Sequence, residues 1–186
     1  MPNSDKRIVI LNEDELRKTI SRLACEIVEK IPNIDNLILV GIPPRGVNLS
    51  EVLRKELFTK TGFDVKSGII DPTFYRDDQN RVGTRLIEAT DIPTSIEKKD
   101  IVLVDDVIYT GRTIRAAMDA LLSWGRPKSV MLLVMIDRGH RELPIQPDFC
   151  GRKVPTSRKE TIYLCLKEVD GKEGIFLDDR SLRDIS

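Results

Sequence analysis

Apolar residues along this chain alternate between helical spacing and short continuous runs. From Leu16 onward they recur every three or four residues for about four turns, which predicts an amphipathic helix. Asn12 and Glu15 can form a capping box at its start, and Pro32 ends it. The uninterrupted apolar run over 37–41 then predicts a strand that is buried on both faces.

The same alternation of helices and buried strands continues through the middle of the chain. Strands that alternate with helices and are apolar on both faces predict an α/β fold, with a central, mostly parallel sheet flanked by helices. The segments concerned are a turn over 43–46, a helix over 49–57, strands at 68–70, 101–104 and 129–136, and a helix over 114–122.

The remaining segments are expected to elaborate this one domain, which we take to span 1–186. The segments 161–166 and 174–177 predict a C-terminal hairpin, joined near Asp170 and Gly171. The polar stretch from Asp71 to Thr84 predicts a long loop, and loops of that length in a compact domain are usually functional or disordered. The last residues, 178–186, are expected to form a frayed tail.

Composition excludes several classes of protein. Lys and Arg number 30, as do Asp and Glu, so a histone-like cationic protein and an acidic tail protein are excluded. The cysteines, Cys25, Cys150 and Cys165, are too few and too widely spaced for a disulfide framework, and with His140 as the single histidine no structural zinc site is expected. The longest apolar run, 130–136, is too short to span a bilayer, so we expect a cytoplasmic protein without a membrane partner.

The connection from the predicted strand at 101–104 to the next helix carries candidate chemistry. Such a loop points backbone N–H groups at a bound anion, and the helix dipole adds to the attraction. Gly111 lets the backbone approach closely, and Thr110 and Thr113 add hydroxyl donors. This arrangement predicts a phosphate site.

Two acids, Asp105 and Asp106, precede this loop. Carboxylates repel phosphate, so they indicate sugar hydroxyls or a metal ion that bridges to phosphate. The ligand should therefore carry a ribose diol beside a phosphate. A simpler interpretation is that Asp105 only caps the helix. The chain lacks both the P-loop pattern and the Gly-x-Gly-x-x-Gly fingerprint.

The whole pattern over 102–113 resembles the phosphoribosyl-pyrophosphate (PRPP) binding loop of type I phosphoribosyltransferases. Further segments are similar to the bifunctional pyrimidine-operon attenuation regulator / uracil phosphoribosyltransferase (PyrR) family, from about Val9 to Leu177. These are Gly41-Ile42-Pro43-Pro44-Arg45-Gly46 (pyrophosphate loop), 73–78 (start of a mobile catalytic loop over about 71–90), 137–144 and 154–157.

The resemblance implies the type I phosphoribosyltransferase fold with a small hood, and the conversion of uracil and PRPP to UMP and pyrophosphate. It also implies Mg²⁺, bound mainly through PRPP oxygens and water. The catalytic residues implied are Asp105, Asp106, Arg45 and Arg76. Those implied to bind PRPP or UMP are Arg45, Gly46, Arg85, Asp105, Asp106, Val107, Ile108, Tyr109, Thr110, Gly111, Arg112 and Thr113; those near uracil are Asp137, Arg138 and Ile162.

A second function implied by the resemblance is binding of pyrimidine operon leader mRNA, dependent on UMP or UTP, by a homodimer or higher homo-oligomer. The segment 126–160 carries eight Lys or Arg against four Asp or Glu, which supports a local basic surface. The candidate RNA contacts are Arg22, His140, Arg141, Arg152 and Lys153. The chain departs from the family pattern at Pro43 and Pro44, at Gln146 and at Cys25.

Two alternatives stay open at this stage. One is an RNA-binding regulator with little or no turnover; the intact acids and Arg45 disfavour it. The other is a type I phosphoribosyltransferase for another nucleobase, which the segment 138–141 disfavours.

Overall fold

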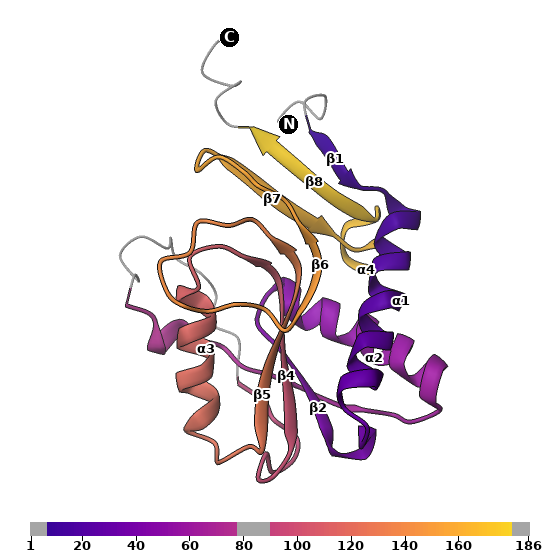
Figure 1. The fold of residues 1–186 in the computed structure, drawn as a ribbon, viewed down its shortest axis with the longest axis vertical. Coiled ribbons are helices and arrows are strands. Elements are labelled where there is room, and N and C mark those ends of the chain that lie inside the picture. Colours follow the sequence, from indigo (N-terminus) through magenta and orange to yellow (C-terminus); the bar gives the residue numbers. More distant parts are fainter. Residues whose placement is uncertain (1–6, 78–89, 180–186) are drawn as a thin grey trace.

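A five-stranded parallel sheet forms the centre of the molecule (Figure 1). The computed structural model describes residues 7–77 and 90–179. The strand order is β3-β2-β4-β5-β6, and every neighbouring pair is parallel, as the sequence pattern predicts. The strands are β2 (Leu37–Gly41), β3 (Lys66–Ile69), β4 (Asp100–Ile108), β5 (Ser129–Asp137) and β6 (Phe149–Lys153).

Helices cover both faces of this sheet. Successive side chains of a strand point to opposite faces. In β4, Val102 and Val104 therefore pack with α1 (Glu13–Lys30) and α2 (Arg45–Thr61), whereas Ile101 and Leu103 pack with α3 (Arg112–Leu122). This explains why the strands read as continuous apolar runs. The capping box of α1 is present: Asn12 accepts from the Glu15 N–H and donates its own N–H to the Glu15 carboxylate, each at 2.9 Å.

A second, antiparallel sheet forms a hood beyond one end of the parallel sheet (Figure 1). The predicted hairpin is confirmed as β7 (Glu160–Cys165) and β8 (Gly174–Asp179), joined through α4 (Lys167–Asp170). β1 (Ile8–Leu11) completes this sheet against β8. The expectation of a frayed tail from residue 178 is wrong at its start, because Asp178 is buried in β8 and pairs with Thr161. The rest of that tail lies outside the described residues.

Some predicted boundaries also need correction. β4 continues four residues beyond the predicted 101–104, to Ile108, because β5 offers backbone partners as far as Asp137. The two acids consequently lie inside the strand instead of after it. α2 begins at Arg45, so the end of the predicted turn over 43–46 is helical. The 43–44 peptide bond is cis.

The loop that begins at Asp71 is described only in part. A short 3₁₀ turn, η3 (Thr73–Tyr75), follows β3. The prediction of a catalytic loop over about 71–90 falls mostly outside the described residues, as does Arg85. Within the described parts of the chain, no helix is both long and apolar enough to cross a membrane.

Candidate functional site

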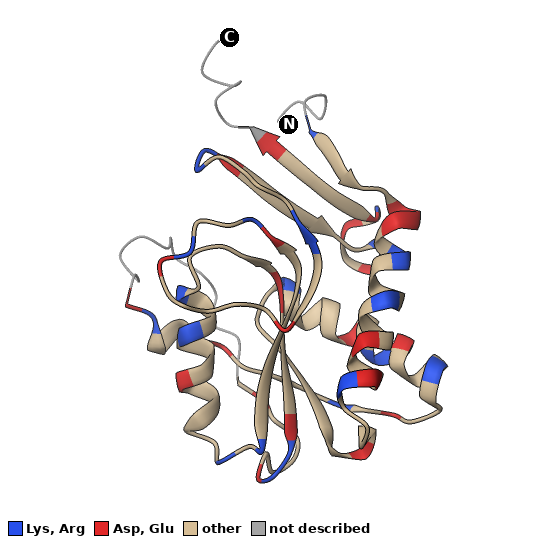
Figure 2. Cartoon of the chain, in the orientation of Figure 1, with Lys and Arg blue, Asp and Glu red and all other residues tan. Residues whose placement is uncertain are grey.

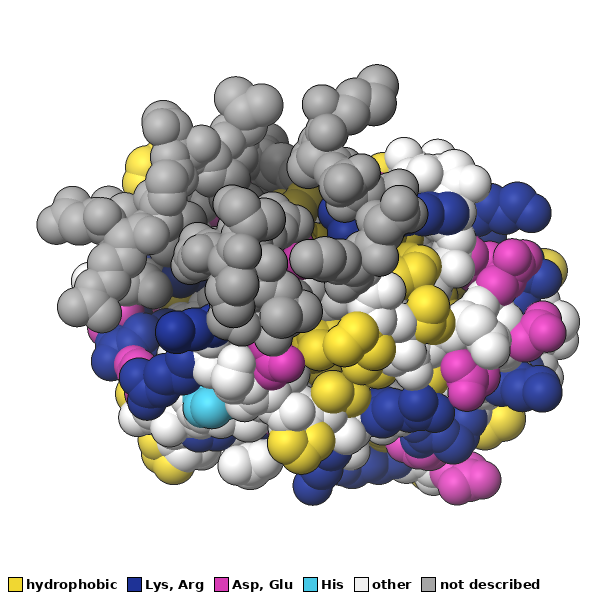
Figure 3. Space-filling view, turned by 90° about the horizontal axis from the view of Figure 1, so that it is seen from above, with side chains coloured by type: hydrophobic (Ala, Val, Ile, Leu, Met, Phe, Trp, Pro, Cys, Tyr) yellow, Lys and Arg dark blue, Asp and Glu magenta, His cyan; other side chains and the backbone are white. Residues whose placement is uncertain are grey.

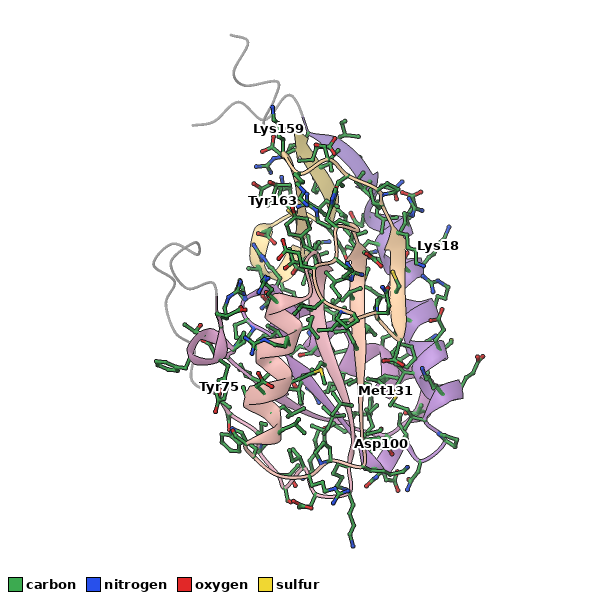
Figure 4. The ribbon with its side chains drawn as sticks, turned by 60° about the vertical axis from the view of Figure 1, so that its left-hand side comes forward. Lys18, Tyr75, Asp100, Met131, Lys159 and Tyr163 are labelled. Carbon is green, nitrogen blue, oxygen red and sulfur yellow. The ribbon has the colours of Figure 1, made fainter. Side chains whose placement is uncertain are left out.

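The candidate site lies at the point where the order of strands in the parallel sheet reverses. β2 leads through α2 to the outer strand β3, whereas its neighbour β4 leads through α3 to β5. The two helices therefore depart to opposite faces, and a crevice opens at the carboxyl ends of β2 and β4, which is where ligands bind in such sheets. Asp100, labelled in Figure 4, marks the opposite end of β4, and Tyr163 marks the hood above the site.

A cavity of about 590 Å³ lies over the connection from β4 to α3. Gly111 takes a left-handed conformation (φ 91°) immediately before α3. The carbonyl of Thr110 accepts hydrogen bonds from the backbone of Glu142 (2.9 Å) and Leu143 (3.2 Å). Because the N–H and C=O of a trans peptide point in opposite directions, the Gly111 N–H faces away from that segment. The predicted residues brought together on this cavity are Arg76, Asp105 and Val107 to Thr113.

Arg141 holds the connection between β4 and α3 in place through backbone carbonyls. Its guanidinium donates to the carbonyls of Tyr109 (2.8 Å) and Ile145 (2.9 Å) and forms an ion pair with Asp137 (2.8 Å). The Arg141 side chain is only 14% exposed. These contacts show that Arg141 holds the loop over 109–113, the candidate phosphate loop, in place. Sequence reasoning missed this role, because the partners are backbone carbonyls. The predicted contact of Arg141 with RNA stays a prediction.

The two acids of β4 face different cavities. Asp105 lines the cavity beside α3, whereas Asp106 lines a second cavity of about 310 Å³ under the hood. The alternation of strand side chains explains this separation. The Asp105 carboxylate accepts from the Asp106 N–H (2.9 Å), and the Asp106 carboxylate accepts from the Val107 N–H (3.0 Å). The pKa of Asp106 is raised, because burial disfavours the charged carboxylate. Hydrogen bonds and the positive charge of Arg45 act in the opposite direction but do not outweigh burial.

Asp106→Asn is expected to stabilise the fold at neutral pH, by about 1 kcal/mol. A carboxyl group whose pKa is raised by folding costs stability when it is ionised, so the cost is present above its folded pKa and disappears below the ordinary value of 3.8. Urea denaturation of both proteins at several pH values would measure the difference. The gain should shrink as the pH falls through the pKa of Asp106; a loss of stability at pH 7 would contradict it.

Arg45 and Gly46 occupy the first turn of α2 at the same crevice. The Arg45 guanidinium pairs with Asp170 of the hood and lines the second cavity with Asp106. Gly46 is required by close packing: a Cβ there would lie 2.2 Å from the Val104 carbonyl oxygen. The structure thus places both predicted residues at the site and gives Gly46 a steric reason.

The start of the loop after β3 is docked on α3. Arg76 donates to the Thr113 hydroxyl (2.6 Å), and Arg112 donates to Asp77 (2.6 Å) and to Glu142 (2.7 Å). Figure 4 shows Tyr75 on this side of the molecule. Arg112, predicted to contribute to the phosphate loop, therefore also ties that loop to its two neighbouring segments.

The residues predicted to lie near uracil are found in two separate places in the structure. Ile162 lines the hood cavity, whereas Asp137 and Arg138 lie at the end of β5 and are not among the described residues that line either cavity. The Arg138 guanidinium lies 4.3 Å from the centroid of the Tyr109 ring and donates to Thr156 (3.0 Å). Burial lowers the pKa of Arg138. Arg138 therefore connects Thr156, in the segment after β6, to Tyr109 of the phosphate loop.

The candidate RNA contacts lie in two places. Arg22, Arg152 and Lys153 are exposed where α1 packs on β6, and Figure 2 shows Lys and Arg on both elements. His140 instead bonds the Thr156 carbonyl and packs edge-on against Tyr109, 5.6 Å between ring centroids. In Figure 3 the face seen from the hood end carries Lys and Arg in several groups with Asp and Glu among them, so positive charge is not confined to one patch there.

This geometry agrees with the comparisons with known proteins. Residues 9–163 match the model of the phosphoribosyl transferase domain, so the chain belongs to that class and is a glycosyltransferase-type enzyme, as predicted. Within the class, it belongs to the family of the bifunctional protein PyrR. It is 51% identical over 170 residues to the PyrR protein of Microcystis aeruginosa (91% of this chain, 96% of that protein) and 45% identical over 174 residues to that of Limosilactobacillus fermentum (92% and 97%). The family prediction is confirmed.

Solved structures confirm the predicted type I phosphoribosyltransferase fold. A hypoxanthine phosphoribosyltransferase from Trypanosoma cruzi superposes with a TM-score of 0.74 at 17% identity, covering 96% of this chain and 97% of that one. A hypoxanthine phosphoribosyltransferase from Staphylococcus aureus gives a TM-score of 0.66 at 20% identity, covering 91% and 90%. At such low identity the likeness concerns the fold alone.

Proposed function

We propose that this chain transfers the phosphoribosyl group of PRPP to uracil, giving UMP and pyrophosphate, and that it also binds pyrimidine operon leader mRNA in a uridine-nucleotide-dependent way. The observation that carries the catalytic half is the pair of cavities on either side of β4. One offers the phosphate loop and Asp105, and the other offers Asp106 and Arg45. A ribose lying across the end of β4 would reach both acids.

In the reaction, the bond from ribose C1′ to pyrophosphate oxygen breaks, and a bond from C1′ to uracil N1 forms as N1 loses its proton. Positive charge develops on the ribose, so preorganised carboxylates beside it stabilise the transition state. The backbone of the loop over 109–113 binds the 5′-phosphate and fixes the sugar, which lowers the entropic cost of reaction. Arg45 meets the negative charge that pyrophosphate gains as it leaves.

The cofactor proposal is Mg²⁺ held mainly through PRPP oxygens and water. Phosphoribosyltransferases generally use Mg²⁺ with PRPP. Within residues 7–77 and 90–179, no group of three or more His, Cys, Asp or Glu side chains is arranged to hold a metal ion. Asp105, which lines the cavity over the phosphate loop, nevertheless fits an ion that takes one carboxylate and completes its shell with phosphate oxygens and water. When bound, the ion neutralises charge on the diphosphate.

The uracil site is proposed to lie under the hood, where Ile162 and Tyr163 line the cavity that contains Asp106. Arg138 lies over the Tyr109 ring, which lines the other cavity, so a contact of Asp137 or Arg138 with uracil stays a prediction from the sequence. Homo-oligomerisation stays an expectation from the family resemblance, and a cytoplasmic location stays one from the sequence.

The experiment that tests both halves uses one purified preparation. UMP formation from uracil and PRPP is measured, and leader RNA is assayed by gel retardation with and without UMP. The proposal expects turnover, and RNA retardation that UMP strengthens. RNA retardation without turnover would favour a pure regulator, and turnover without retardation would confine the function to the enzyme.

Reversing charge on the α1–β6 surface should separate the two functions. Lys18 and Lys153 are both exposed on this surface, so Lys18→Glu with Lys153→Glu is expected to weaken RNA binding at least about tenfold, since phosphate contacts dominate such affinity. UMP formation should be unchanged. Lys66→Glu, a single charge reversal on β3 at the opposite edge of the sheet, is the control. Equal RNA affinity of the double variant and the control at matched salt would contradict an RNA site on this surface.

A further inference from the structure

Arg45 is held by an ion pair that crosses from the parallel sheet to the hood. Its Nη1 and Nη2 atoms donate to the two carboxylate oxygens of Asp170 at 3.0 and 2.7 Å. The side chains are only 29% and 18% exposed. Parallel two-point pairing of this kind fixes the plane of a guanidinium as well as its position. Arg45 therefore has one defined orientation at the crevice.

The ion pair borders the cavity in which the proposed chemistry takes place. Arg45, Asp170 and Asp106 all line the hood cavity. A guanidinium has five N–H donors, and the pairing with Asp170 uses only two of them. Arg45 thus keeps donors for an anionic ligand while Asp170 holds it.

Asp170 is itself fixed by its own segment. Its Oδ2 atom also accepts a hydrogen bond from the Leu166 N–H (2.9 Å), which lies just before α4. Gly171, in the left-handed conformation (φ 67°), ends that helix. The carboxylate is therefore anchored to backbone on one side and to Arg45 on the other.

We propose that Asp170 is a positioning residue, which orients Arg45 toward the pyrophosphate group of PRPP. This inference rests on the proposed function, in which Arg45 meets that group. A long side chain loses rotamer freedom when it binds a ligand. An arginine that is already oriented loses less, so Asp170 strengthens the interaction of Arg45 with pyrophosphate without touching the ligand.

The first test is Asp170→Asn, which keeps acceptor oxygen but removes the charge and the two-point pairing. The KM for PRPP and the inhibition constant of added pyrophosphate are expected to rise about tenfold, consistent with the sensitivity of catalysis to small misplacements. The KM for uracil should rise less than the KM for PRPP, because the proposed effect acts through Arg45. Glu168→Gln is the matched control: Glu168 lies on the same helix and pairs with Lys55 of α2 at 2.8 Å, and both of those side chains are exposed. It should leave all three constants unchanged.

The second test is a double-mutant cycle with Arg45→Ala, with thermal melting to confirm that each variant is folded. If Asp170 acts through Arg45, Asp170→Asn has no further effect on pyrophosphate inhibition in the Arg45→Ala background. Additive effects would overturn the positioning role, as would tighter pyrophosphate binding by Asp170→Asn, which would make the carboxylate a competitor. Unchanged pyrophosphate inhibition in Arg45→Ala alone would instead overturn the proposed contact of Arg45, and with it the role of Asp170.

Discussion

Replacing both Asp105 and Asp106 with asparagine is expected to abolish UMP formation while the chain stays folded. The two carboxylates are the acids that face the proposed ribose from either side of β4. Their removal takes away charge that stabilises the developing cation, and the loss of one preorganised electrostatic contact alone typically costs about 10²–10³ in rate. The asparagine oxygens can still accept the backbone hydrogen bonds that Asp105 and Asp106 accept now.

The double variant is measured by UMP formation and by thermal melting. Asp100→Asn is a suitable control, because Asp100 is also a buried acid of β4 but lies at the opposite end of the strand (Figure 4). Burial raises its pKa, but hydrogen bonds from Ser129 (2.7 Å) and Lys128 (3.0 Å) outweigh that effect and lower it. The control should therefore lose stability and keep turnover. Wild-type rates in the folded double variant would exclude the assigned site.

Gly46→Ala is expected to disrupt both stability and catalysis. The new Cβ would lie 2.2 Å from the Val104 carbonyl oxygen and 3.2 Å from the Asp105 Cα, and both are backbone atoms that cannot rotate away. The start of α2 must therefore shift from β4. Overpacking of this kind costs about 1–3 kcal/mol. A displacement of about 1 Å between Arg45 and the acids would reduce turnover about 100-fold.

Gly62→Ala provides the matched control at the other end of α2. Gly62 has φ 72°, and nothing lies within 4 Å of a Cβ built there. Alanine is strained in that conformation, so some stability is lost, but the crevice is not disturbed. Kinetics and urea denaturation of the two variants separate the effects. If Gly46→Ala were as active as Gly62→Ala, close packing of α2 on β4 would not be what shapes the site.

Sequence periodicity was sufficient to predict the helices and strands whose formation depends on nearby residues in the sequence. The start of α1 at its capping box, the strand at 37–41 and the C-terminal hairpin all depend on local spacing and turn residues. Periodicity could not predict where β4 ends, because its last residues are polar or follow the acids and are held in the strand by β5. Short strands such as β1 and β6 were also missed, since each takes its place mainly through its partner.

The candidate site could be predicted where a single loop forms it, and could not be predicted where segments distant in the sequence meet. The phosphate loop and the acid pair form a continuous motif, so residues 105–113 could be recognised. The segment after Val169 contains no recognisable motif, yet Asp170 pairs with a residue 125 positions earlier. The role of Arg141 is equally invisible in sequence, because it depends on carbonyl groups that any residue possesses.

The fold changes how the excess of basic residues in 126–160 is interpreted. Two of the basic residues of 126–160, Arg138 and Arg141, are largely buried and bond neighbouring segments. The other six are exposed: Arg126, Lys128, Arg152, Lys153, Arg158 and Lys159. The exposed residues are the ones most accessible to RNA phosphates. The basic segment therefore predicts a smaller RNA surface than its composition suggests.

The most direct measurement of the central claim is nucleotide formation by the purified protein with PRPP, Mg²⁺ and either uracil or hypoxanthine. UMP and pyrophosphate are expected in equal amounts with uracil, and no comparable product is expected with hypoxanthine. Formation of inosine monophosphate at the higher rate would contradict the assignment to uracil, and the absence of any nucleotide product would contradict the assignment of a working phosphoribosyltransferase site.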